Sequence, residues 1–176
     1  MSDRLGESLM RNAVLAGVVL SPEPATRWRL GQAVGVRFAD VFDSWDQSHA
    51  YGHVSTLVRA HLVTPIGPSK RPRYRASPAG VETWRGWLTR PIDPRIPLRD
   101  TLARLRACRD RDYATMLAII DLCEAELHCA LERPNPADDS PLTVHLARNA
   151  RRNRAVADLR WCQAARDEIA AQAAAG

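Results

Sequence analysis

Residues 62–80 read LVTPIGPSKRPRYRASPAG, and this stretch decides the fold. Two short strand-like segments, 62–66 and 73–76, flank a turn rich in glycine and proline, and this order predicts a β-hairpin. The tip of the hairpin, residues 70–73, holds three cations, Lys70, Arg71 and Arg73, with Pro72 between the last two. Ser77 and Pro78 then predict the start of a helix, because serine caps a first turn and proline fits its first position.

Two helix-like segments open the chain. The first is the apolar run at 12–20, which must end at the two prolines of 21–24. The second begins at Thr26, a suitable cap, and continues to about Val34. On or near its apolar face we expect Trp28, Leu30 and Val34.

A third helix is expected from Ser48, as its cap, to Leu62. Its buried stripe should lie at apolar positions that recur every three or four residues: Tyr51, Val54, Leu57 or Val58, and Leu62. The opposite face is polar and contains no acid: His49, His53, Ser55, Thr56 and Arg59. Three short helices followed by a basic hairpin are the order of a winged helix-turn-helix, whose third helix fits the major groove of DNA.

The charge of the chain is unevenly distributed and agrees with that interpretation. Residues 1–92 contain 12 Lys and Arg against 7 Asp and Glu, whereas residues 93–176 contain 13 of each. A basic domain joined to a neutral one indicates that the first domain meets a polyanion. We therefore predict DNA contacts from the third helix and the hairpin tip: Ser48, His49, Tyr51, His53, Ser55, Thr56, Arg59, Lys70, Arg71 and Arg73.

The second domain, 93–176, is expected to be a helical arm. Pro91, Pro94 and Pro97 predict a stiff, extended linker at its start. Helical patterns follow at 98–107, 110–131 and 142–173. The chain as a whole is therefore expected to be mainly α, or α+β by its hairpin: a winged helix-turn-helix over 1–92 followed by this arm.

The two long helices of the arm carry apolar stripes that need a partner. Two amphipathic helices joined by a short loop cannot cover both stripes, so a second copy of the chain is expected to do so. The expected dimer interface comprises Tyr113, Leu117, Ile120, Leu127, Leu131, Leu146, Leu159 and Trp161. The alternative is that the helices fold back onto the first domain.

Several classes of protein are not expected. The longest apolar run is far shorter than the roughly 18 residues of a membrane helix, so we expect a cytoplasmic protein with no membrane contact. Cys108, Cys123, Cys129 and Cys162 lack the close spacing of a zinc site and are expected to be core residues, with no metal and no cofactor. His49, His53 and His61 lack the acids that complete a catalytic site, so no enzyme is expected.

One block of residues resembles the PadR-like regulators, a family named for control of phenolic acid decarboxylase. Its signature is an aromatic residue, a polar residue, Thr-Pro-Ala-Gly and a helix ending in Trp-Leu; here residues 74–80 read YRASPAG, and Trp87-Leu88 follow. The family's third helix has a Tyr, two leucines and then Gly-Leu-Val, matched here by Tyr51, Val54, Leu57 and His61-Leu62-Val63.

The chain also departs from the family pattern. Where the family usually has Pro, one residue, His-Gly-Tyr, one residue and Leu, residues 24–30 read PATRWRL. The helix-ending glycine has become His61, and the long helical tail is matched mainly by pattern, with Trp161 near its end. The chain thus resembles a divergent member of the family.

The resemblance implies a bacterial homodimer that binds a palindromic operator in double-stranded DNA and represses a neighbouring operon. Some members of the family are released by a small aromatic or planar ligand, and Trp28 is the residue that the resemblance offers for such an effector. The alternative is a winged-helix protein-interaction module that no longer binds DNA.

Overall fold

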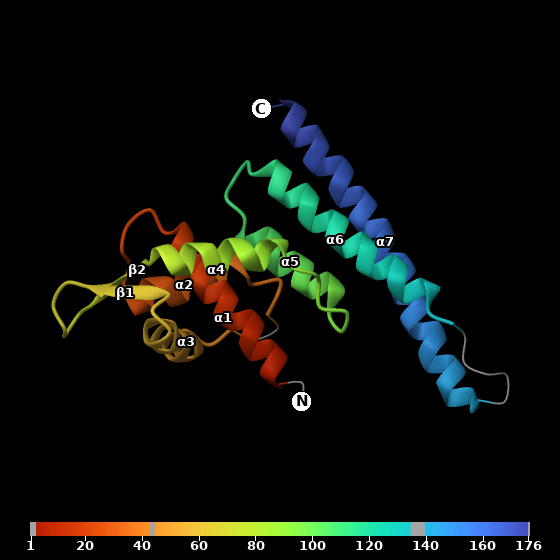
Figure 1. The fold of residues 1–176 in the computed structure, drawn as a ribbon, viewed down its shortest axis with the longest axis horizontal. Coiled ribbons are helices and arrows are strands. Elements are labelled where there is room, and N and C mark those ends of the chain that lie inside the picture. The colour runs from red at the N-terminus through yellow and green to blue at the C-terminus, as the bar shows by residue number, and fades with distance from the viewer. Residues whose placement is uncertain (1–2, 43–44, 135–139, 176) are drawn as a thin grey trace. The chain divides into compact units, whose positions relative to one another are not determined.

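A computed structural model describes residues 3–42, 45–134 and 140–175 (Figure 1). The chain forms two compact units, and the division between them passes through one helix, α5 (Pro97–Ala107). The first unit comprises residues 1–90 and 102–109, and the second comprises 91–101 and 110–176. The fold is mainly α with one two-stranded antiparallel sheet, as the sequence predicts.

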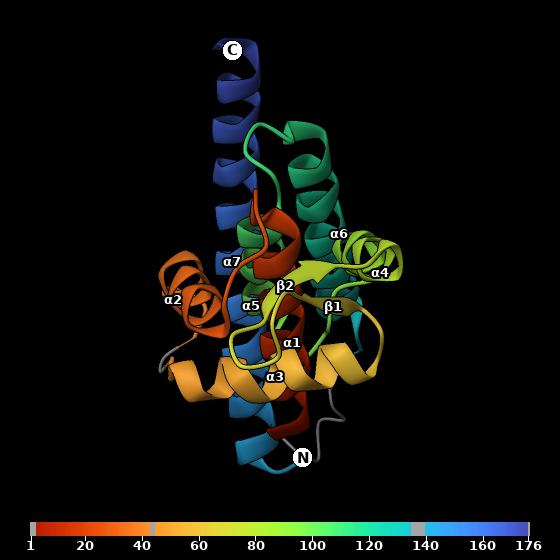
Figure 2. The ribbon, with the colours of Figure 1, turned by 90° about the vertical axis from the view of Figure 1, so that its left-hand side faces the viewer.

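The first unit is a winged helix-turn-helix. Its elements are α1 (Asp3–Leu20), α2 (Arg27–Arg37), α3 (Gln47–Arg59), β1 (Val63–Ile66), β2 (Arg73–Ala76) and α4 (Pro78–Thr89). The two strands pair from Val63 with Ala76 to Ile66 with Arg73. Figure 2 views this unit from the hairpin side, with α3 running below the two strands.

Helix α1 is the centre of the first unit. Every residue from Asn12 to Val18 is buried, so this part of the helix has no solvent face. A helix that is apolar all round must be enclosed by other elements, and α2, α3, α4 and β2 all contact it. The apolar run at 12–20 therefore predicted a helix correctly, but α1 begins nine residues earlier, at Asp3.

Helix caps explain where α2, α3 and α4 begin. Thr26 caps α2 and Ser77 caps α4, as predicted, and the Ser77 hydroxyl accepts a hydrogen bond from the Gly80 amide at 3.0 Å. For α3 the prediction was wrong: the cap is Asp46, whose carboxylate accepts a hydrogen bond from the Ser48 amide at 2.8 Å. Acceptors at this position satisfy amides that have no partner within the helix.

Two aromatic residues do not face the core as expected. Tyr51 is 36% exposed, because the buried stripe of α3 is Ala50, Val54 and Leu57, one position away. Trp28 is 53% exposed, whereas Leu30 and Val34 of α2 are buried as predicted. One residue corresponds to about 100° around a helix, so a one-position shift of the stripe turns a side chain into solvent.

The second unit is built on two long helices that lie side by side, α6 (Tyr113–Glu132) and α7 (Leu142–Ala175) (Figures 1 and 2). The buried residues of α6 are Ile119, Ile120, Cys123 and Leu127, and those of α7 are Ala155, Asp158 and Cys162. The Arg166 guanidinium joins the helices through Asp121 and Glu124, each at 2.6 Å. Each helix therefore covers part of the other.

The segment before α5 is not the extended linker that its prolines predict. The Ile96 amide donates to the Asp93 carbonyl at 3.1 Å, which closes a turn, and Ile92 is buried. The Asp93 amide donates to the carboxylate of Asp100 at 3.1 Å. These contacts hold the segment against the first turn of α5.

Two further expectations concern membranes and cysteines. Among the described residues, none of the helices combines the length and apolarity needed to span a bilayer. All four cysteines are free thiols; Cys108, Cys123 and Cys162 are buried, whereas Cys129 is exposed and so is not the core residue expected.

Candidate nucleic-acid interface

Helix α3 presents one face to the core and the other to solvent. Ala50, Val54 and Leu57 are fully buried, and α1 and α2 pack behind them. Ser48, Tyr51 and Arg59 lie on the exposed side, whereas Ser55 and Thr56 are half-exposed. The helix is therefore held rigidly from behind while its polar side chains remain available to a partner.

Hydrogen bonds define what the polar side chains of α3 can offer. The Ser55 hydroxyl donates to the Tyr51 carbonyl and the Thr56 hydroxyl donates to the Gly52 carbonyl, both at 3.1 Å. Because each hydroxyl proton is used within the helix, its oxygen can act only as an acceptor toward a partner, and the Thr56 oxygen already accepts one hydrogen bond from Arg59 Nη2 at 3.4 Å. Acceptors at these positions suit the exocyclic amino groups of cytosine and adenine in the major groove.

The two candidate histidines differ from these residues. His53 is half-buried on α3 and has interactions within the chain. The side chain of His49 lies outside the described residues, so its role in binding DNA stays a prediction. In the described part of the chain, no group of three or more His, Cys, Asp or Glu side chains could hold a metal ion.

The hairpin carries an exposed row of cations. Lys70, Arg71 and Arg73 are exposed, as expected for a tip that meets a partner. The tip folds by a turn in which the Arg71 amide donates to the Pro68 carbonyl at 3.1 Å. Gly67 has a φ of 87°, which glycine adopts without strain and most other residues do not.

Arg75 is a further exposed cation that the sequence analysis did not single out. Side chains alternate along a strand, so Arg73 and Arg75 of β2 share one face while Tyr74, between them, is buried on the other. The period of two in residues 73–76 is the signal that could have identified it.

Tyr74 fastens the hairpin to the start of α2. Its backbone pairs with Ala25 through hydrogen bonds of 2.9 and 3.2 Å. Its hydroxyl accepts a hydrogen bond from Arg27 Nε at 2.8 Å, and the guanidinium lies 5.4 Å from the ring centroid. This contact joins residues 47 positions apart, so no local sequence pattern could have predicted it.

The electrostatics of this region are one-sided. Between residues 47 and 81 the chain contains five Lys and Arg and no Asp or Glu. Figure 2 shows α3 and the hairpin on the same side of the first unit. We call the exposed face of α3 together with residues 67–75 the basic face; it has no acid of its own to neutralise it, which suits a polyanion.

The remaining predicted site residues lie elsewhere. Trp28 does not line the cavity beside α2. The tryptophan that lines it is Trp45, whose indole Nε1 donates a hydrogen bond to the Gly31 carbonyl at 2.9 Å. In the arm, Ile120 and Leu127 are buried within the single chain and Leu146 is 58% exposed. The other residues expected at a dimer interface are half-buried: Tyr113, Leu117, Leu131, Leu159 and Trp161.

Comparisons with known proteins add a distant structural likeness. No family model matches the sequence, and no curated protein does. Among solved structures, the chain is similar to Bacillus subtilis PadR in complex with operator DNA, with 15% sequence identity and a TM-score of 0.38. The match covers 89% of this chain and 97% of that one. A likeness at this level assigns neither family nor function to the chain.

Proposed function

We propose that this protein is a homodimeric, DNA-binding transcription regulator. The observation that carries the proposal is the basic face: a recognition-type helix with an exposed polar side, next to a hairpin whose cations have no acidic neighbours. A helix of this kind fits the major groove, and a basic hairpin beside it can follow the phosphate backbone or enter the minor groove.

The residues divide into two roles. Tyr51, Ser55 and Thr56, with Ser48, His49 and His53, are the candidates for contacts with base edges. Arg59, Lys70, Arg71 and Arg73 are the candidates for phosphate contacts, and Arg75 joins them because it shares a strand face with Arg73. Phosphate contacts fix the position of a protein on DNA, whereas base contacts select the sequence.

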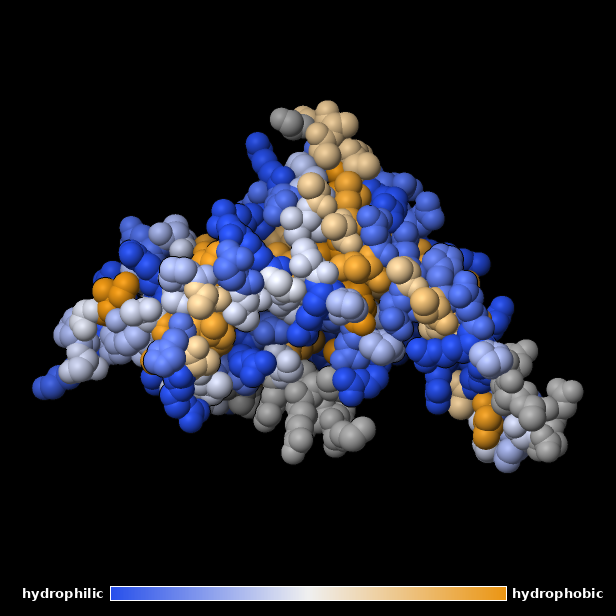
Figure 3. All heavy atoms as spheres, in the orientation of Figure 1, coloured by the Kyte–Doolittle hydropathy of each residue, from blue (hydrophilic) through white to orange (hydrophobic). Residues whose placement is uncertain are grey.

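The proposed dimer forms through the helical arm. Leu142, Val144 and Leu146 are exposed at the start of α7, and Val156 lies further along the same helix. Figure 3 shows exposed apolar residues near the start of α7. A second copy of the arm would cover them, together with the half-buried residues of the predicted interface. Such a dimer would place two basic faces on the half-sites of a palindromic operator.

The proposed biological role is repression of transcription. The regulator acts in the bacterial cytoplasm as a repressor of a neighbouring operon, with release by a small molecule. The exposure of Trp28 gives no support to a pocket at that position, so the effector is sought elsewhere in the chain.

Selection of bound duplexes from a random DNA library tests the function. We expect enrichment of a palindrome whose half-sites are separated by about one helical turn, or a multiple of it. On the selected duplex, Arg71→Ala with Arg73→Ala should reduce the salt slope of log K by roughly 1.8, because each phosphate contact contributes about 0.9. Arg85→Ala is the matched control, since Arg85 is an exposed cation on α4 paired with Glu82.

The alternative function is a winged-helix interaction module that has lost DNA binding. Its support is the substitution of the usual signature at residues 26–28 by Thr, Arg and Trp. Absence of any enriched duplex at low salt, with a folded dimer in hand, would favour this alternative and overturn the regulator.

A further inference from the structure

The second unit contains a cavity that the proposed DNA contacts do not use. Its volume is about 690 Å³, and its walls are residues 94–99, which include the start of α5, the end of α6 with Arg133, and residues 148–158 of α7. All of these lie within the second unit. Cavities that bind drug-sized molecules measure roughly 300–1,000 Å³, so this one is large enough for such a ligand.

Arginine dominates the charged lining of this cavity. Seven arginines surround it against a single acid, Asp158. Two come from the segment before α5 and its first turn, one follows α6 and four come from residues 148–154 of α7. Counting Asp93 and Glu126 as well, which pair with Arg95 and Arg133 at 2.9 and 3.7 Å, the arginines still outnumber the acids by four.

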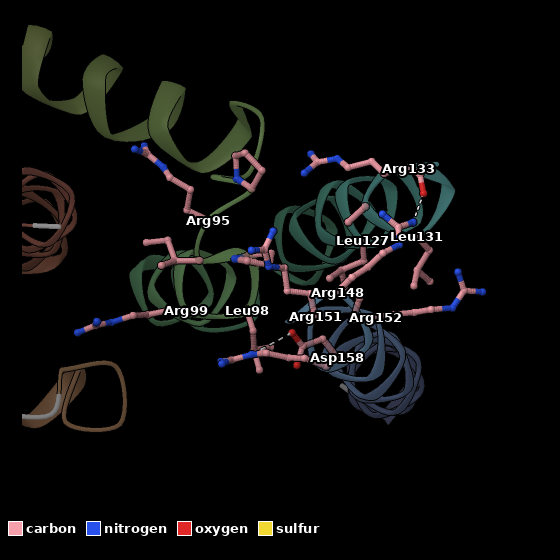
Figure 4. Close-up of a pocket in the computed structure, with 16 residues that line it drawn as sticks. Arg95, Leu98, Arg99, Leu127, Leu131, Arg133, Arg148, Arg151, Arg152 and Asp158 are labelled. Carbon is pink, nitrogen blue, oxygen red and sulfur yellow. Dashed lines mark hydrogen bonds and ion pairs between the residues drawn. The ribbon is translucent and has the colours of Figure 1, made fainter. Parts of the chain in front are cut away.

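The arginines at the centre are placed differently from those at the rim. Figure 4 shows Arg99 and Arg152 extending outward on opposite sides, whereas Arg148 extends from α7 toward the end of α6 and Arg151 extends toward α5. Arg148 donates to the carbonyl of Arg133 and so is held in position. Arg151 has no ion-pair partner among the described residues.

An apolar surface lies beside these cations. Leu98, Leu127, Leu131 and Ala155 line the same cavity. Asp158, the one acid, is buried and faces Arg154 at 3.9 Å. Four of the arginines lie within residues 148–154 of α7, where like charges repel one another, and the apolar side chains beside them give no compensation. A ligand with a negative group and an apolar body would satisfy both surfaces.

We propose that this cavity binds an organic anion, namely a carboxylate or phosphate group attached to an apolar body. Arg148 and Arg151 hold the anionic group, and the leucines of α5 and α6 cover the apolar part. Binding depends on the second unit alone. That the anion is the effector of the regulator rests on the proposed function.

Isothermal titration calorimetry of the full chain, without DNA, tests the binding. The probes are decanoate, decyl phosphate, the cation decyltrimethylammonium, and acetate, which has the charge without the apolar body. We expect saturable binding of decanoate or decyl phosphate, with the tighter of the two identifying the preferred anionic group. The cation and acetate should bind far more weakly.

Variants locate the site. Arg148→Gln with Arg151→Gln should weaken binding of the anion by about tenfold or more, because charge-assisted hydrogen bonds are lost. Arg160→Gln is the matched control, because Arg160 is an exposed cation on α7 outside the cavity lining. If the double variant does not fold, Arg151→Glu alone reverses one exposed charge and should abolish binding.

Three results would overturn the proposal. The cation could bind as tightly as the anions, which would make the site merely apolar. Arg160→Gln could weaken binding as much as the double variant, which would indicate a diffuse charge effect. The arginine variants could weaken DNA binding while anion binding is unchanged or absent, which would assign the arginines to DNA. A failure of DNA binding in the wild-type chain would leave the calorimetric result standing.

Discussion

At the scale of single residues, His61 has an unusual conformation. Its φ is 56°, in the left-handed region, and it follows the last turn of α3. Glycine is preferred after a helix end because it has no Cβ to clash in this conformation. The PadR-like regulators that the sequence resembles have glycine here. The Ser77 hydroxyl donates to the His61 carbonyl at 2.8 Å, which helps to hold the strained backbone.

Replacing His61 by glycine should therefore stabilise the protein. We expect His61→Gly to raise the free energy of unfolding by about 0.5–1 kcal/mol, because the strain removed exceeds the added freedom of the unfolded chain. Urea denaturation followed by circular dichroism measures it. Ala60→Gly is the control: Ala60 has a φ of −82°, so the same replacement one residue earlier should lower stability. Destabilisation by both replacements would contradict the prediction.

Burial is the residue-scale property that the sequence predicted least well. Arg104 is fully inside the protein, where its Nη1 atom donates to the carbonyls of Leu88, at 3.4 Å, and Arg90 at the end of α4. Carbonyls at a helix end need such donors. Nothing local distinguishes Arg104 from the exposed Arg106 in the same helix. Only the packing of the end of α4 against α5 does so.

At the scale of elements, the contact between α4 and the hairpin depends on Gly80. A Cβ atom added to Gly80 would lie 2.0 Å from the Leu62 carbonyl oxygen, just before β1. That carbonyl also accepts a hydrogen bond from the Ser77 amide at 3.0 Å. The first turn of α4 is thereby pressed against the base of the hairpin, which explains why a glycine follows Ser77-Pro78-Ala79.

Alanine at Gly80 should displace the hairpin, whereas alanine at Gly86 should not. We expect Gly80→Ala to lower stability by roughly 1–3 kcal/mol, the usual range for overpacking. Gly86 lies in the same helix with nothing within 4 Å of an added Cβ, so Gly86→Ala should raise stability by up to about 1 kcal/mol through helix propensity. Thermal unfolding of both variants gives the comparison. Equal effects at the two positions would disprove the close contact.

Local signals predicted the elements well, and contacts between distant residues limited the rest. The period of apolar residues and the caps at Thr26 and Ser77 predicted the hairpin and most helix boundaries within a few residues, whereas the start of α1 was missed by nine. The faces of α2 and α3 were predicted wrongly at Trp28 and Tyr51, because these side chains are apolar enough to suit either a core or a surface. The Tyr74–Arg27 contact and the arginine-lined cavity bring together residues far apart in the sequence.

At the scale of the whole molecule, the two long helices of the arm bury more of their apolar side chains against each other than the sequence predicted. Ile120 and Leu127 are buried without a second copy, because α7 lies along α6. What remains for a partner is the half-buried set and the exposed start of α7. A dimer that uses this surface should therefore be sensitive to Leu146, whose side chain is 58% exposed in the single chain.

A charge at Leu146 separates dimerisation from folding. We expect Leu146→Glu to convert the dimer to a folded monomer, because the charge would be desolvated only when the second copy binds. Sedimentation velocity over a range of concentrations measures the change, and circular dichroism should show unaltered helix content. Gln163→Glu adds the same charge at an exposed polar position of α7 and should leave the dimer intact. If Leu146→Glu remains as dimeric as the wild-type chain, the first turns of α7 are not the interface. A monomer that also binds the palindrome with unchanged affinity would show that paired half-sites are not required.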